Sequence, residues 1–212
     1  MRTMRRGHWL LLLTLLLLGI GWLWLRPGTS AKFTNLPPTA SGEWVTFGDS
    51  LTQGYGANEG GDFPTQLAKR LRVKIRNLGV SGNTTADGLA RLDQAAQLQP
   101  RVVLLCLGGN DALRGVPAET TFANLGTMID RFHQAGSFVV LLGVRSVGLT
   151  DKNAKRFEQL AKSKRVLLVP NILDDILFTP SLMADQIHPN DLGYAKISER
   201  LEAKLVPLMQ NL

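Results

Sequence analysis

The chain has 212 residues, of which 44% are hydrophobic, and a formal net charge of +7, which suits one globular domain with a buried core. Four arginines and no acidic residue lie in residues 1–31, so the remainder carries only +3 and has no dense basic patch to indicate nucleic-acid binding. The single cysteine excludes an intramolecular disulfide, and the three scattered histidines lack metal-ligand spacing, so we expect no metal and no cofactor.

Residues 9–25 form an uncharged, leucine-rich run that follows three arginines and ends near two tryptophans. As a helix this run would span roughly 25 Å, close to the ~30 Å hydrocarbon core of a bilayer. We therefore predict a transmembrane anchor within residues 1–25. A cleaved signal segment is the open alternative, since Thr29-Ser30-Ala31 is a passable, though weak, cleavage site. The positive-inside tendency places the rest of the chain on the extracytoplasmic side. There the domain would stay anchored to the membrane, or it would be secreted if the segment is cleaved.

Residues 26–42 are rich in Pro, Gly, Ser and Thr and are interpreted as a linker, which leaves 43–212 as the folded domain. Short β-branched or fully apolar runs, typical of strands buried on both faces, occur in this domain at 44–47, 73–80, 102–107, 138–144 and 166–169. Helix-like stretches separate and follow them at about 61–71, 84–97, 119–135, 151–163 and 190–209, the last with Asn190 or Asp191 as N-cap. This alternation predicts a three-layer α/β/α sandwich around a five-stranded parallel sheet, with its site at the carboxyl ends of the strands.

The first polar cluster, residues 48–54 (GDSLTQG), follows the first predicted strand. A serine in the first turn of a helix, here Ser50, lies beside free backbone N–H groups and the positive end of the helix dipole. This setting suits a nucleophile whose attack creates an oxyanion. The alternative is an ordinary helix cap formed by Asp49 or Ser50.

Two further clusters follow the second and third predicted strands. In residues 77–84, Gly82 would let the backbone approach a ligand and present its N–H. In residues 107–111 (LGGND), Asn110 would aim its side-chain NH₂ at a developing negative charge. Ordinary strand-to-helix turns remain the alternative for both.

The fourth cluster, Asp185 to Pro189, precedes the last predicted helix. Its spacing of three allows Asp185 to hold His188 through Nδ1–H while Nε2 accepts a serine proton, although a surface loop with an incidental pair would look the same. Taken together, a serine, two oxyanion donors and an Asp–His pair make up the groups needed for acyl transfer.

These blocks resemble those of the SGNH (GDSL-type) hydrolase superfamily, and within it the multifunctional thioesterase, lysophospholipase and arylesterase group. The similarity covers about residues 44–207 and implies a flavodoxin-like SGNH hydrolase fold. It also implies Ser50 as nucleophile, His188 as general base and acid, and Asp185 as the group that orients it. The oxyanion hole would comprise the N–H of Ser50, the N–H of Gly82 and the side chain of Asn110.

The expected function is therefore hydrolysis of acyl esters, thioesters or lysophospholipids through an acyl-enzyme, with a small-molecule or lipid ester as substrate and the membrane as partner of the N-terminal helix. In the resembling thioesterases the loop after the fourth strand shapes the acyl site, so we expect Arg145, Val147 and Leu149 to contact substrate. This loop is short and lacks aromatic residues, which argues against long acyl chains. Two alternatives remain: a carbohydrate O-acetylesterase acting on envelope polysaccharide, and a non-catalytic phosphate- or nucleotide-binding module, for which the chain lacks a P-loop motif. The oligomeric state is not indicated.

Overall fold

The computed structural model describes residues 32–144 and 153–212, and these belong to one compact unit, Lys32–Leu212. The anchor helix predicted within residues 1–25 lies outside these ranges. Among the residues that are described, no helix is both long enough and apolar enough to cross a bilayer.

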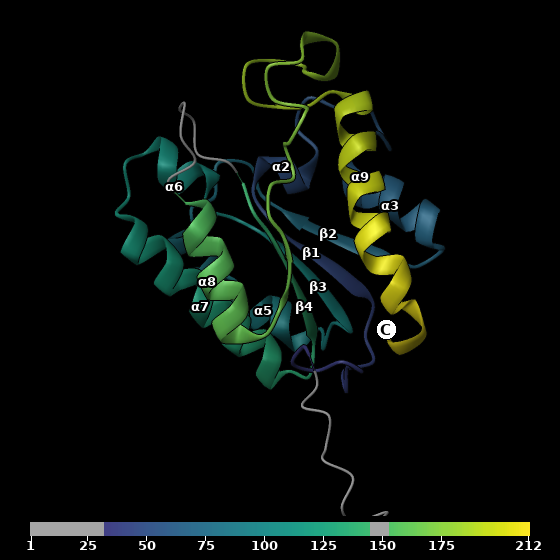
Figure 1. Ribbon diagram of the computed structural model, residues 1–212, viewed down its shortest axis with the longest axis vertical. Coiled ribbons are helices and arrows are strands. Elements are labelled where there is room, and N and C mark those ends of the chain that lie inside the picture. The colour runs from purple at the N-terminus through teal and green to yellow at the C-terminus, as the bar shows by residue number, and fades with distance from the viewer. Residues whose placement is uncertain (1–31, 145–152) are drawn as a thin grey trace, which may run out of the picture. The chain divides into compact units, whose positions relative to one another are not determined.

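Five parallel strands form one sheet, which confirms the predicted architecture (Figure 1). Their order across the sheet is β2 (Ile75–Gly79), β1 (Trp44–Gly48), β3 (Val102–Cys106), β4 (Phe138–Leu142) and β5 (Leu167–Val169). The register aligns the carboxyl ends of the first three, since Gly48 pairs with Gly79 on one side and with Cys106 on the other. The loops after these strands therefore begin at the same level.

The three central strands β1, β3 and β4 are buried along their whole length, as the apolar runs predict. The expectation of burial on both faces was wrong for β2, where Arg76 and Asn77 are exposed. Because β2 is an edge strand, its polar side chains reach solvent, and the apolar residues Ile75 and Leu78 are only partly buried.

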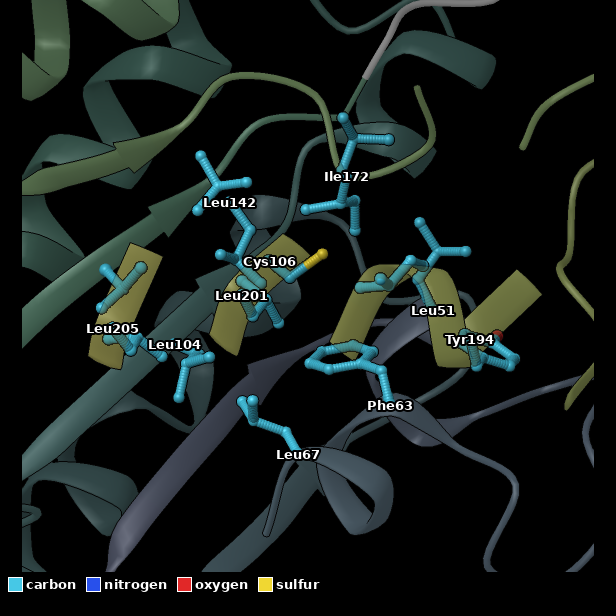
Figure 2. Packing of buried hydrophobic residues seen from close by; sticks show 14 of the residues in the cluster. Leu51, Phe63, Leu67, Leu104, Cys106, Leu142, Ile172, Tyr194, Leu201 and Leu205 are labelled. Atoms are coloured by element: carbon cyan, nitrogen blue, oxygen red, sulfur yellow. The ribbon is translucent and has the colours of Figure 1, made fainter. Parts of the chain in front are cut away.

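One face of the sheet is covered by α3 (Phe63–Leu71) and α9 (Asp191–Leu205), and the other by α5 (Leu92–Gln97), α7 (Ala118–Gln134) and α8 (Ala154–Lys164) (Figure 1). Alternate residues of each central strand enter different layers, so that Leu104 packs toward α3 and α9 while Leu105 packs toward α7. Figure 2 shows the first layer, where Phe63 and Leu67 meet side chains of α9 and of the sheet.

Two predicted helices differ from the observed elements. The stretch 84–97 is divided into α4 (Thr85–Ala90) and α5 at Arg91, whose backbone leaves helical geometry with φ −115° and ψ 9°. The last helix ends at Leu205 and continues as a 3₁₀ turn, Val206–Asn211, because Pro207 has no N–H to donate to the α-helix. Its N-cap is Asn190, which accepts hydrogen bonds from two backbone N–H groups.

The segment before β1 packs along the amino end of the sheet. The Asn35 side chain donates to the carbonyl oxygens of His133 (2.9 Å) and Ser137 (3.0 Å), where α7 ends. The N–H of Thr34 donates to the carbonyl of Arg165 at 2.8 Å, just after α8. These contacts lie within the compact unit Lys32–Leu212.

Candidate active site

Ser50 is the first residue of α2 (Ser50–Gln53), directly after β1. The preceding Asp49 is the N-cap, and its carboxylate accepts the N–H of Leu51 at 3.1 Å. The two neighbouring residues thus have separate roles. Asp49 caps the N-terminus of α2, while the Ser50 hydroxyl faces the turn that carries His188. The Ser50 N–H donates to no other described residue, which leaves it available to a ligand.

His188 lies in the turn before α9 and reaches the serine. Its Nε2 is 3.0 Å from Ser50 Oγ, and its Nδ1 is 2.7 Å from Asp185 Oδ2. The other carboxylate oxygen, Oδ1, accepts the backbone N–H groups of Ile187 (2.8 Å) and His188 (2.7 Å). Asp185 therefore holds both the ring and the backbone of the turn, and the three side chains form one hydrogen-bonded line.

The pKa of Asp185 reflects two opposing effects. Partial burial raises this pKa. The hydrogen bonds from the His188 ring and from the two backbone N–H groups together lower it by more, so the net shift of the pKa is downward. The carboxylate consequently stays ionised at neutral pH. An ionised acceptor favours the His188 tautomer with the proton on Nδ1, and this leaves the Nε2 lone pair facing the serine hydroxyl.

The loop between α2 and α3 supports the histidine, a contact that the sequence did not reveal. The Tyr55 ring packs against the imidazole with centroids 4.5 Å apart, and the Tyr55 carbonyl accepts the hydroxyl of Tyr194 at 2.8 Å. Gly56 follows with φ +89°, and a Cβ there would lie 2.8 Å from the Ala184 side chain. The close approach of the two loops requires glycine at this position.

Gly82 lies in the turn after β2 with φ +80°, and its N–H has no acceptor among the described residues. Asn110 belongs to α6 (Gly109–Leu113), after β3, and its Nδ2 donates to the carbonyl of Asn83 at 3.0 Å and approaches Asp49 Oδ2 at 3.4 Å. The turns that bear Ser50, Gly82 and Asn110 thus meet at one edge of the sheet.

Two buried carboxyl groups lie beneath these donors. Asp49 is only 2% exposed, and burial raises its pKa from 3.8 to about 7 although the Leu51 N–H opposes the shift. Asp111 accepts the N–H of Thr85 at 2.8 Å and the hydroxyl of Thr121 at 3.2 Å, so it joins α4, α6 and α7. The sequence offered no signal for this role beyond the position of Asp111 next to Asn110.

A cavity opens beside Ser50 and His188. Its walls are mostly apolar and come from distant segments; they include Ala112, Leu113, Val144, Leu173, Leu177 and Ile187. The predicted substrate contacts Arg145, Val147 and Leu149 lie outside the described residues. Sequence reasoning missed Leu173 and Leu177, since they belong to an irregular segment after β5 that has no recognisable motif.

A parallel five-stranded sheet that brings a Ser–His–Asp line and an Asn-containing turn to one edge defines an SGNH-type α/β hydrolase. Residues 46–196 match the GDSL-like Lipase/Acylhydrolase family. The chain belongs to this family, and it is a carboxylic ester hydrolase.

Similar proteins agree with this assignment. An arylesterase of Vibrio mimicus is 33% identical over 179 residues, which cover 79% of this chain and 90% of the relative. The thioesterase 1/protease 1/lysophospholipase L1 of Escherichia coli (strain K12) is 31% identical over 79% of this chain and 85% of its own length. The crystal structure of TesA superposes with a TM-score of 0.72 at 30% identity and covers 78% of this chain and 98% of TesA.

Proposed function

We propose that Ser50 is the nucleophile of this esterase, that His188 is its general base and acid, and that Asp185 orients the imidazole. The observation that supports these roles is the hydrogen-bonded line from Asp185 Oδ2 through His188 to Ser50 Oγ, with steps of 2.7 and 3.0 Å. Both steps lie within the reach that proton transfer requires.

In the proposed cycle, Ser50 Oγ attacks the ester carbonyl carbon while His188 Nε2 takes the hydroxyl proton. The carbonyl oxygen becomes an oxyanion that accepts hydrogen bonds from the N–H of Ser50, the N–H of Gly82 and Nδ2 of Asn110. His188 then gives its proton to the leaving alcohol or thiol as the carbon–oxygen or carbon–sulfur bond breaks. Water, deprotonated by His188, attacks the acyl-enzyme and releases the acid and Ser50.

We further propose that the substrates are single-chain acyl esters, lysophospholipids among them. The apolar walls of the cavity beside Ser50 offer an acyl chain contact on several sides, whereas a sugar ring would need more polar partners than these walls supply. The names of the similar proteins, arylesterase and thioesterase/lysophospholipase, point in the same direction.

We also propose that the domain works on the extracytoplasmic side of a membrane. Support comes from the sequence alone: the uncharged run 9–25 follows Arg2, Arg5 and Arg6, the pattern of a segment that leaves its N-terminus in the cytoplasm. Protease added to intact spheroplasts should degrade the full-length protein. Protection of the domain until the cells are lysed would contradict this placement.

The catalytic proposal is tested with purified wild type and the variants Ser50→Ala and Ser163→Ala, the second being a matched change at an exposed serine of α8. A panel of p-nitrophenyl acetate, octanoate and palmitate, together with a lysophospholipid, defines the substrate. We expect turnover of the shorter acyl esters to vanish in Ser50→Ala alone, with an unchanged melting temperature. Turnover that persists in Ser50→Ala would refute the nucleophile. An acetylated oligosaccharide is assayed beside the panel, and wild-type activity confined to that substrate would refute the acyl-ester assignment.

A further inference from the structure

Arg91, the residue that separates α4 from α5, reaches back beneath the active site. Its guanidinium donates three hydrogen bonds: Nε to Asn83 Oδ1 at 2.8 Å, Nη1 to the Leu78 carbonyl at 2.9 Å, and Nη2 to the Gly48 carbonyl at 2.8 Å. The guanidinium carbon also lies 4.0 Å from the centroid of the Phe47 ring. All three acceptors are neutral oxygens, and partial burial lowers the pKa of Arg91, although the group remains charged.

Each acceptor of Arg91 is close in the chain to a proposed oxyanion donor. Gly48 ends β1 two residues before Ser50. Leu78 belongs to the end of β2, and Asn83 follows Gly82 directly in the turn after that strand.

The connection continues to the third donor through a second hydrogen bond. The backbone carbonyl of Asn83 accepts Asn110 Nδ2 at 3.0 Å, so the residue whose side chain Arg91 holds also orients the Asn110 amide. One planar cation is therefore linked to the segments that carry all three donors, and these segments come from three different strands of the sheet.

Arg91 lies at the break between α4 and α5. Its φ and ψ of −115° and 9° differ from helical geometry, which a continuous helix over 84–97 would require. In the described structure, the three acceptors of the Arg91 guanidinium include neither His188 nor Asp185, so the network meets the proton-transfer line only through the segment that carries Ser50.

We propose that Arg91 is a positioning residue for the oxyanion hole, which holds the ends of β1 and β2 and the Asn83 side chain so that the three donors converge on one point. The proposal rests on the Ser50-centred ester hydrolysis proposed above and is independent of acyl-chain preference and of membrane attachment. Misplacement of donors by about 1 Å is enough to cost on the order of 100-fold in rate. Because the ground-state ester makes weaker use of these donors than the tetrahedral intermediate, the loss falls on kcat rather than on KM.

The test compares Arg91→Gln and Arg91→Lys with Arg70→Gln. Arg70 is a matched control because it joins α3 to α9 through ion pairs with Glu199 (2.7 Å) and Glu202 (3.0 Å), on the sheet face away from α4 and α5. The substrate is p-nitrophenyl butyrate, active sites are counted with a fluorophosphonate, and melting is followed by circular dichroism. Wild-type turnover and labelling, measured first, test the esterase function separately.

We expect kcat per labelled site to fall about 100-fold in Arg91→Gln, with KM within about threefold of wild type. Arg91→Lys should retain more activity than Arg91→Gln because it keeps the positive charge. Its kcat should still be only about one tenth of wild type, because an ammonium group is a point donor that cannot match the planar three-acceptor geometry. Arg70→Gln should melt at a lower temperature and keep its kcat.

A folded Arg91→Gln enzyme with wild-type kcat would overturn the proposal, and so would a loss that appears only as raised KM. If Arg91→Gln fails to fold, Arg91→Lys decides: wild-type kcat below its melting temperature overturns the proposal, and a reduced kcat with unchanged KM supports it. A fall in kcat that tracks melting temperature equally in Arg91→Lys and Arg70→Gln would assign Arg91 a structural role alone.

Discussion

Replacing Asp185 by Asn changes one atom of the proposed triad and should nearly abolish turnover. The Asp185 carboxylate accepts three hydrogen bonds: two from backbone N–H groups on Oδ1, at 2.7 and 2.8 Å, and one from His188 Nδ1 on Oδ2 at 2.7 Å. In Asp185→Asn the amide oxygen can still serve both N–H groups, which turns the NH₂ group toward His188. A donor then faces Nδ1, so the imidazole must carry its proton on Nε2, 3.0 Å from Ser50 Oγ, where it can no longer accept the serine proton.

The same Asp→Asn change in a serine triad costs about 10⁴ in kcat, which corresponds to roughly 5 kcal/mol of activation free energy. Hydrolysis of p-nitrophenyl butyrate near neutral pH measures this loss, and circular dichroism checks that the variant is folded. Asp93→Asn is the control, since Asp93 is an exposed carboxylate on α5 that pairs only with Arg131 in the described structure. A kcat for Asp185→Asn within tenfold of wild type would refute the orienting role of the carboxylate.

Two further predictions concern stability and selectivity. Asp49 keeps its proton up to about pH 7 in the folded state but releases it near pH 3.8 when unfolded, so the unfolded state binds fewer protons in this window and the stability of the wild type falls as the pH rises through it. Asp49→Asn cannot titrate at this position. Its free energy of unfolding relative to wild type should therefore rise between pH 4 and 7 by a few kcal/mol, on the order of 1.36 kcal/mol per unit of pKa shift. Urea unfolding that gives the same difference in free energy at all pH values would contradict this. Leu177→Trp should fill the cavity and lower the octanoate-to-acetate ratio of kcat/KM about tenfold or more. An equal loss with both esters would show that Leu177 does not contact the acyl chain.

Local sequence was sufficient to predict most of the architecture. The apolar runs that became β1, β3 and β4 are buried from end to end, as their composition predicts, whereas the same expectation failed for β2 at the edge of the sheet. The polar motifs directly after the strands could be placed together because parallel strands end at one edge of a sheet. Asp185 and His188 were recognisable from their spacing of three, which allows one turn to bring the two side chains into contact.

The sequence by itself thus determined which residues enter the sheet and which polar groups gather at its edge, since both follow from hydrophobic periodicity and strand direction. Only the tertiary structure decided which long-range partners those groups acquire. The Arg91 guanidinium donates a hydrogen bond to the carbonyl of Gly48, forty-three positions away in the chain. The Tyr55 ring packs against His188, and burial raises the pKa of Asp49. These properties depend on distances and solvent exclusion between segments far apart in the chain, and neither quantity is encoded in a local pattern.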